Sequence, residues 1–257
     1  MVIQYNNLLV LVAMEREFNE VLKCFPETHD IIVSKRLGIY AKEYNIKKYK
    51  FIITQSGVGT VNAALATALI AEQYPLDAIL LLGVAGALQD FLKIGDIVLA
   101  SKVLQHDSIW SGKEQRVLMA PGKLFVSLNQ KDREKPEFMI DTRFFTLLKS
   151  LLESNPRLKF HTGSILSGNE FVGDFQRKVD ITKIDPHALA VEMESAGVAQ
   201  VAKKLGIPFA VIKTIADRLN PAGSISGEYN NFIQLAAENS MKVVDLLICR
   251  DSSLRSE

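Results

Sequence analysis

Two patterns of apolar and polar positions alternate along the chain. Short runs that are almost wholly apolar are followed by stretches in which apolar residues recur every three to four positions. The first pattern predicts buried strands, and the second predicts amphipathic helices. Strands are expected at residues 8–13, 51–55, 77–88, 95–101, 159–166, 188–191 and 209–215, with two shorter polar strands within 31–49. Helices are expected at residues 15–24, 60–74, 144–153, 195–205 and 232–249, with an irregular excursion at 107–136.

Strands that alternate with helices predict an α/β fold whose sheet is at least partly parallel. The run at 77–88 is apolar at nearly every position, which suits a parallel strand covered by helices on both faces. No linker and no internal repeat divides the chain. The sequence therefore predicts a single domain over residues 1–250, followed by a disordered tail at 251–257.

Composition narrows the range of partners. The chain has 257 residues and a formal net charge of +1, so neither nucleic acid nor a membrane surface is an expected partner. Its two cysteines, Cys24 and Cys249, lack the spacing of a zinc site and are expected to be reduced thiols. The apolar run at 8–14 has no basic region before it and is too short to span a bilayer. These features favour a cytoplasmic protein.

Candidate chemistry gathers where the predicted strands end. The segments "AMERE", "QSGVGT", "GVAGAL", "SGNEF", "VEMES" and "TIAD" stand at these ends and supply glycines and carboxylates. Ligands of open α/β sheets bind at the carboxyl ends of strands. The glycine segments match neither the dinucleotide fingerprint nor the P-loop. Two explanations stay open for them: tight turns between strand and helix, or close approach of the backbone to a small ligand.

The segment "VEMES" places Glu192 and Glu194 two residues apart at the end of an apolar run. A strand that turns into a helix explains them if the helix N-terminal dipole favours the carboxylates, and a binding site is the alternative. The four histidines are scattered without metal-site spacing, and no G-x-S-x-G elbow supports a serine hydrolase. His106 and Asp107 are expected to form a structural hydrogen-bonded pair.

Taken together and in order, these motifs resemble those of the nucleoside phosphorylase superfamily, and within it the methylthioadenosine/S-adenosylhomocysteine nucleosidases. The likeness runs from Leu8 to Val244 and is carried by "VAMERE", "SGVGTVNAA", "GVAGAL" with "LKIGDIV", "SGNEFV", "VEMESAGVAQVA" and "TIAD". Of these segments, "VEMES" is the most specific. The resemblance implies a mixed, partly barrel-like central sheet flanked by helices, in a homodimer that needs no cofactor and takes a small nucleoside as its substrate.

The resemblance also implies hydrolysis of the N-glycosidic bond in a 5′-substituted adenosine, through an oxocarbenium-like ribose. Asp217 of "TIAD" would give a proton to N7 of the leaving adenine and accept a hydrogen bond from its 6-amino group. A carboxyl that acts as an acid near neutral pH needs a raised pKa, which an enclosed apolar site supplies. Glu17 of "AMERE" would activate the attacking water, although its place in a first helical turn also fits a simple dipole effect.

The same resemblance implies a set of binding residues. Glu194 would accept hydrogen bonds from the ribose hydroxyls, with Met193 against the sugar and Glu192 in support. Phe171 would stack on adenine, and Val172 would meet the edge of the base through its backbone; by composition, either also fits an ordinary core. The pocket for the substrate and its 5′ substituent is expected to include Met14, Val58, Val84 and Tyr229.

Several positions differ from the pattern that is usual in the family. Asn169 replaces an aspartate, Lys213 replaces an arginine, and Ala216 replaces the serine before the catalytic aspartate. Leu81 stands where phosphorylases of this fold carry an arginine that holds phosphate, so water is favoured over phosphate as the nucleophile. A purine nucleoside phosphorylase, an aminofutalosine-type nucleosidase and a non-catalytic nucleoside-binding protein stay open as alternatives. The sequence does not distinguish methylthioadenosine, S-adenosylhomocysteine and 5′-deoxyadenosine as substrates.

The excursion at 107–136 supports the expected homodimer. Its apolar side chains need covering if the segment does not fold back on its own subunit. These side chains are Ile109, Trp110, Leu118, Leu124 and Phe125. Trp110 would then reach the site of the neighbouring subunit.

Overall fold

The structure of the protein is a computed structural model that describes residues 5–113, 116–120, 137–218 and 225–249, several positions of the last helix by backbone alone. Its strands, in chain order, are β1 (Asn7–Val12), β2 (His29–Ser34), β3 (Ile39–Ile46), β4 (Tyr49–Gln55), β5 (Ala78–Ala87), β6 (Ile97–Gln105), β7 (Ile109–Ser111), β8 (Arg116–Leu118), β9 (Glu137–Met139), β10 (Phe160–Ser167), β11 (Ala188–Glu192) and β12 (Phe209–Asp217). Its helices are α1 (Glu15–Leu22), α2 (Thr60–Gln73), α3 (Thr142–Glu153), α4 (Phe175–Thr182), α5 (Ser195–Leu205) and α6 (Ile225–Cys249).

Five neighbouring strands close into a barrel within a ten-stranded mixed sheet. The sheet runs in the order β11-β10-β6-β12-β5-β1-β4-β3-β2, and β9 pairs with β6. The barrel closes because β11 also pairs with β5, through Ala190 and Val191. Beyond β5, the strands β1 and β4 are parallel to it, and β3 and β2 continue as an antiparallel extension. The predicted mixed, partly barrel-like sheet is therefore confirmed.

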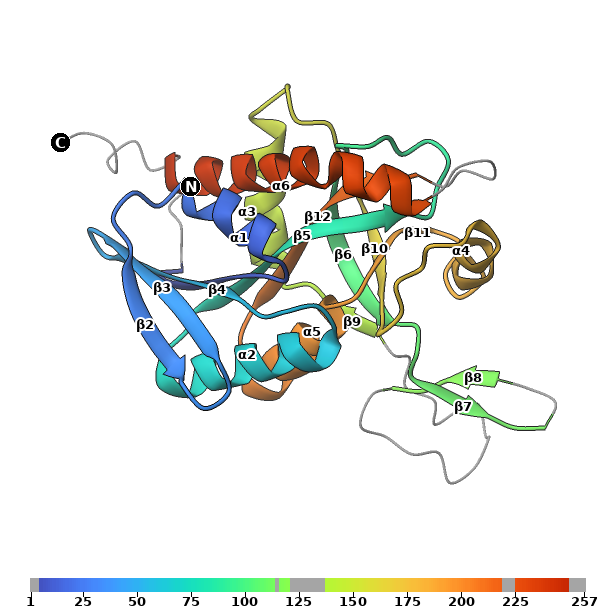
Figure 1. Cartoon of the computed structure of the whole chain (residues 1–257), viewed down its shortest axis with the longest axis horizontal. Coiled ribbons are helices and arrows are strands. Elements are labelled where there is room, and N and C mark those ends of the chain that lie inside the picture. Colours follow the sequence, from blue (N-terminus) through green and yellow to red (C-terminus); the bar gives the residue numbers. More distant parts are fainter. Residues whose placement is uncertain (1–4, 114–115, 121–136, 219–224, 250–257) are drawn as a thin grey trace.

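Helices cover the sheet on both faces (Figure 1). α1, α3 and α6 lie on one side, and α2 and α5 pack together on the other. Every residue of β12 is buried, and β5 is buried at nine of its ten positions. Burial on both faces explains why these strands read as continuous apolar runs rather than as alternating patterns. No helix of the described ranges is long and apolar enough to cross a membrane.

The seven predicted apolar strands and the five predicted helices are present, with ends that shift by a few residues. The excursion is not wholly irregular, because β7 and β8 pair as a hairpin, which Figure 1 shows projecting from the body of the molecule. Leu124, Phe125 and the predicted tail lie outside the described residues.

Besides the β7–β8 hairpin, three features were not predicted: β9, α4 and about the first two turns of α6, residues 225–231. β9 has only three residues, too few for a period to be recognised. In α4, only Lys178 and Ile181 are buried, so the helix has almost no apolar repeat.

α2 and α5 cross closely at Gly197. A Cβ atom at this position would lie 2.0 Å from the carbonyl oxygen of Thr60, the first residue of α2, so only glycine permits the approach. The N–H of neighbouring Gly59 donates to the carboxylate of Glu194, the residue that caps α5, at 3.1 Å. The crossing therefore fixes the start of α2 against the end of the "VEMES" segment.

Gly197→Ala is expected to lower the melting temperature by about 2–12 °C, since overpacking costs about 1–3 kcal/mol and each kcal/mol corresponds to about 2–4 °C at this chain length. Lys204→Ala, at an exposed position of the same helix, is the matched control and should melt close to the unmodified protein. Calorimetry on the two variants measures the difference. Equal melting temperatures would contradict the close crossing.

Candidate active site

A cavity of about 240 Å³ opens at the carboxyl ends of β1, β5, β11 and β12, slightly smaller than the usual range for small-molecule sites. Its wall contains five carboxylates and, among the described residues, no lysine or arginine. Ten of the eleven predicted site residues line it: Met14, Glu17, Val58, Val84, Phe171, Val172, Glu192, Met193, Glu194 and Asp217. The eleventh, Tyr229, belongs to α6, and its side chain lies outside the described part of the structure.

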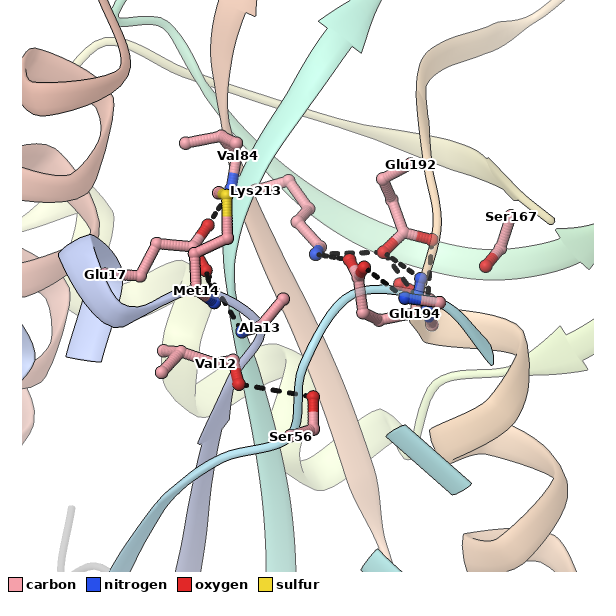
Figure 2. Close-up of polar contacts among 12 residues, drawn as sticks. Val12, Ala13, Met14, Glu17, Ser56, Val84, Ser167, Glu192, Glu194 and Lys213 are labelled. Carbon is pink, nitrogen blue, oxygen red and sulfur yellow. Dashed lines mark hydrogen bonds and ion pairs between the residues drawn. The ribbon is translucent and has the colours of Figure 1, made fainter. Parts of the chain in front are cut away.

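Backbone groups hold both carboxylate oxygens of Glu17, which lies in the first turn of α1 and is 2% exposed. Oε2 accepts hydrogen bonds from the N–H groups of Ala13 (3.0 Å) and Met14 (2.9 Å), and Oε1 accepts one from Val84 (2.9 Å) (Figure 2). Burial raises the pKa of Glu17 above its ordinary value, although the charge of Lys213 and the three backbone hydrogen bonds act in the opposite direction. A raised pKa makes this carboxylate a better proton acceptor than an ordinary one.

Gly83 and Gly86 leave room for two of the acids. A Cβ atom at Gly83 would lie 2.7 Å from a carboxylate oxygen of Glu17, and one at Gly86 would lie 3.0 and 3.1 Å from the two oxygens of Asp217. Gly86 is also the partner of Asp217 in the parallel pairing of β5 with β12. The tight-turn explanation of "GVAG" is wrong, because both glycines lie inside β5 and admit carboxylates to the strand backbone.

Glu192 and Glu194 share one buried cation. Nζ of Lys213 lies 2.9 Å from Oε2 of Glu192 and 3.0 Å from Oε2 of Glu194, and Figure 2 shows the ammonium pointing to both. Glu192 also accepts hydrogen bonds from the N–H groups of Glu194 and Ser195, all at 3.1 Å, where α5 begins. Glu192 therefore accepts from N–H groups at the start of α5, as the strand-to-helix explanation of "VEMES" expects, and it also lines the cavity. Its role in binding stays a prediction.

The shared lysine leaves the two glutamates in different charge states. Burial disfavours the charge of Glu192, but the charge of Lys213 and hydrogen bonds from Ser167, Lys213 and the Glu194 N–H outweigh it and lower the pKa of Glu192. Burial, with the negative charges of Glu192 and Glu17, raises the pKa of Glu194 to about 7 despite Lys213. Burial alone would lower the pKa of Lys213, but the three glutamates raise it overall. Near neutral pH, Glu192 and Lys213 are charged, whereas Glu194 is divided between its two forms.

Asp217 is held by a second buried lysine. It ends β12 at 4% exposure, and its Oδ2 accepts a hydrogen bond from Nζ of Lys178, a residue of α4 with no exposed surface. Lys178 does not line the cavity, so it contacts Asp217 from outside it. Contrary to expectation, the surroundings of Asp217 are therefore not apolar alone, because the ammonium of Lys178 contacts its carboxylate.

The segment after β10 flanks the cavity. Phe171 lines it while 54% exposed, and Val172 is buried. The side-chain oxygen of Asn169 accepts a hydrogen bond from the N–H of Thr60 (2.9 Å), and its amide nitrogen donates to the hydroxyl of Thr60 (2.6 Å). These bonds tie the segment to the start of α2.

The expected hydrogen bond between His106 and Asp107 is absent. Neither ring nitrogen of His106 has a hydrogen-bond partner within the described part of the chain, and burial lowers the pKa of the imidazole. Asp107 instead accepts from the N–H of Asn169 (2.7 Å) and from the side chain of Gln105 (2.8 Å).

Other chemistries find little support in the wall of the cavity. Leu81 is fully buried within β5, so no cation stands at that position. Across the described ranges, no group of three or more His, Cys, Asp or Glu side chains could hold a metal ion. What the site offers is acids of different charge state around a small cavity, an arrangement suited to moving protons and stabilising positive charge.

The two lysines and Glu170, the fifth carboxylate of the wall, were not predicted as site residues. Lys213 drew attention only as a replacement for arginine, and its place between two glutamates depends on how β11 meets β12. Nothing in the polar run "QRKVD" distinguishes Lys178 from an exposed lysine. Its neighbour Arg177 is half-exposed and forms an ion pair with Glu170 at 2.6 Å.

Comparison with known proteins agrees with this geometry. The family model described as "Phosphorylase superfamily" matches residues 7–248. The 5′-methylthioadenosine/S-adenosylhomocysteine nucleosidase of Staphylococcus haemolyticus is 30% identical over 240 residues, which cover 93% of this chain and 97% of that protein. The protein of that name from Exiguobacterium sp. is 28% identical over 235 residues, which cover 91% and 94%.

A solved structure supports the same assignment. The 5′-methylthioadenosine/S-adenosylhomocysteine nucleosidase of Neisseria meningitidis, in complex with methylthio-immucillin-A, superposes with a TM-score of 0.79 at 26% identity. The match covers 95% of this chain and 98% of that one. Family model, relatives and fold agree over nearly the whole length, and the chain therefore belongs to the phosphorylase superfamily and, within it, to the family of the 5′-methylthioadenosine/S-adenosylhomocysteine nucleosidases.

Proposed function

We propose that the chain hydrolyses the N-glycosidic bond of 5′-substituted adenosines and releases adenine. The observation that carries this proposal is the wall of the cavity, with five carboxylates and no lysine or arginine among the described residues. A phosphate nucleophile needs cations to hold it, whereas a wall of acids suits a neutral water and a ribose that becomes positive. The names of the relatives support the choice of methylthioadenosine and S-adenosylhomocysteine as substrates.

Glu17 is proposed as the base that activates the water. Its three backbone hydrogen bonds fix the carboxylate at the cavity wall, and its raised pKa brings it closer to the pH at which proton transfer is efficient. A water between Glu17 and C1′ of the ribose would lose a proton to the carboxylate as it attacks.

Glu194 and Met193 are proposed to hold the ribose, with Glu192 in support. Glu194 is anchored by the N–H of Gly59 and by Lys213, so its carboxylate is oriented before the substrate binds. The acids outnumber the cation they share, and this excess of negative charge stabilises an oxocarbenium-like ribose more than a neutral one. Such an interaction is stronger in the transition state than in the ground state, which is what accelerates a reaction.

The base is proposed to lie against Phe171 and the backbone of Val172, with Asp217 at N7 and the 6-amino group. The 5′ substituent is proposed to lie among Met14, Val58, Val84 and Tyr229, where apolar side chains suit a thioether.

With these substrates, the chain would act in the cytoplasm, in the salvage of methionine.

A second copy of the chain is proposed to cover the entrance. Val58 and Phe171 line the cavity, yet they are 45% and 54% exposed, and Val61 on the adjoining turn of α2 is 72% exposed. Leu65, one turn further along α2, is 38% exposed. A continuous apolar edge beside a binding site is a typical place for a subunit contact. Ile109, Trp110 and Leu118 of the hairpin offer further apolar surface.

Adenine release should proceed equally well with and without phosphate, because the described wall of the cavity contains no cation to hold the anion. The assay offers methylthioadenosine, S-adenosylhomocysteine and 5′-deoxyadenosine in phosphate-free buffer and with added phosphate, and follows both adenine and the sugar product. Accumulation of a ribose 1-phosphate would establish a phosphorylase instead. Tight adenine binding without turnover of any substrate would establish a non-catalytic binding protein.

Asp217→Asn should lower kcat by about 10²–10⁴-fold, the usual range for loss of a general acid, while substrate binding weakens far less. The variant also leaves Lys178 buried without its partner, and removal of one member of a buried pair costs about 3–5 kcal/mol. Asp217→Asn combined with Lys178→Met should therefore regain thermal stability but not turnover. If the stabilised double variant kept more than about a tenth of the kcat, Asp217 would have no part in the mechanism.

Sedimentation at micromolar concentration should show a dimer. Val61→Glu should dissociate it, because the substitution places a charge in the proposed contact. Leu37→Glu is the matched control, since Leu37 is 53% exposed in the turn between β2 and β3, away from the cavity. A fully active monomer, or equal behaviour of the two variants, would rule out the proposed contact.

A further inference from the structure

Among the described residues, Lys178 is the most completely buried lysine or arginine, and it does not line the cavity. It has no exposed surface, it lies in the eight-residue helix α4, where the other buried residue is Ile181, and its Nζ donates to Oδ2 of Asp217. The carbonyl oxygen of Arg218 accepts a second, longer hydrogen bond from it at 3.4 Å. Gly86 admits the pair to the backbone of β5, since a Cβ atom there would lie 3.1 Å from Nζ.

A gain in folding stability does not explain why a lysine occupies position 178. Taking an ammonium out of water costs several kcal/mol, and replacing a buried ion pair by apolar groups of similar volume is often neutral or stabilising. The position faces the core beside Ile181, on the same helix, where an apolar side chain would pack without that cost. The partner of Lys178 is also not an arbitrary acid, because Asp217 lines the cavity.

The pair changes what Asp217 offers to a leaving base. An ammonium in contact with a carboxylate favours the ionised form of that carboxylate, and an ionised carboxylate accepts hydrogen bonds but has no proton to give. A purine leaves readily only if it is protonated as the glycosidic bond breaks. Nζ of Lys178 carries protons and donates a hydrogen bond to this carboxylate.

We propose that Lys178 supplies the proton that Asp217 passes to the leaving base, so that the two residues act as one donor; this rests on the proposed hydrolysis. As the C1′–N9 bond breaks, its electron pair passes to the purine. N7 takes a proton from the carboxyl of Asp217, and that carboxyl takes one from Nζ of Lys178. The base leaves neutral, Asp217 is again a carboxylate, and Lys178 is a neutral amine. Glu17 has gained the proton of the attacking water, and solvent exchange returns both residues to their starting forms.

Lys178 is thus a positioning residue that acts through Asp217 and never touches the substrate. The other charged groups around the cavity form ion pairs or hydrogen bonds that do not involve Lys178. Glu170 is paired with Arg177, and Glu192 and Glu194 are paired with Lys213. Glu17 is held by backbone N–H groups across the cavity. A change at Lys178 should therefore act on the titration of Asp217 before that of any other acid.

The pH dependence of kcat/KM tests the proposal with Lys178→Met. In the unmodified protein the donor is an ammonium, a much weaker acid than a carboxyl, so activity should persist into the alkaline range. In Lys178→Met the donor is a lone buried carboxyl, and the alkaline limb should move to lower pH by about one unit or more. The acidic limb, which reports Glu17, should stay in place. Lys183→Met is the matched control, because Lys183 is exposed on the same helix in an ion pair with Asp180, and its profile should not change.

Lys178→Arg gives an independent readout. Arginine keeps the positive charge beside Asp217 but does not release its proton, so kcat should fall about 10²-fold or more at every pH while adenine still binds. Lys178→Met should then be the more active of the two below neutral pH. A purely structural ion pair predicts the reverse order, with arginine as the better replacement.

Each outcome decides the matter. If the alkaline limb of Lys178→Met moved to higher pH, Lys178 would only oppose the protonation of Asp217. If the limb did not move, Lys178 would be a structural residue. Either result would overturn the proposal. Melting temperatures show whether Lys178→Arg is folded, and if it is not, the profile of Lys178→Met decides alone. Absence of base release by the unmodified protein would instead refute the proposed hydrolysis, and the donor role with it.

Discussion

The contact of Lys213 with Glu192 and Glu194 is the interaction on which the site depends. Four acids that line the cavity are each at most 5% exposed, and an isolated buried carboxylate would cost several kcal/mol or become neutral. One ammonium, at 2.9 and 3.0 Å from two of them, keeps Glu192 charged and lets Glu194 titrate near neutral pH. Its charge also opposes the effect of burial on Glu17. A single side chain of β12 thus sets the charge of three acids from different elements.

The topology of the sheet brings these elements together. Because β11 pairs back onto β5 while β12 pairs with β5 from the other side, the ends of three strands that are distant in sequence surround one cavity. The glycines of β5 then let Glu17 and Asp217 approach the strand backbone, and the close crossing of α2 with α5 brings the N–H of Gly59 to Glu194. Each acid is consequently held by groups of an element other than its own. The site is preorganised by the fold before any ligand enters.

The sequence predicted the elements that bury an apolar face and missed those that do not. β5 and β12 are recognisable because burial on both faces demands a continuous apolar run, whereas α4 buries only a lysine and an isoleucine. The acids of the site drew attention because they lie in segments that follow predicted strands, and the resemblance to the nucleosidase family supplied their expected roles. Their cations were not found, because an ion pair across 39 residues, such as Lys178 with Asp217, depends on how two elements pack and leaves no local pattern. The hydrogen bond expected between His106 and Asp107 failed for a related reason: adjacency in sequence does not decide which way two side chains of an extended segment point.

The two buried lysines differ in a way that matches the direction of the proposed reaction. Lys213 is shared by several acids, so the part of the cavity proposed for the ribose keeps an excess of negative charge. Lys178 forms an ion pair with Asp217 alone among the acids of the described site, so the charges of this pair balance in the part proposed for the base, and the ammonium supplies the proton of the proposed transfer. Breaking the C1′–N9 bond makes the ribose positive and sends electrons to the base. A field that is negative at the sugar and supplies an ammonium behind the base favours that separation of charge, and it does so with groups whose positions are already fixed by folding.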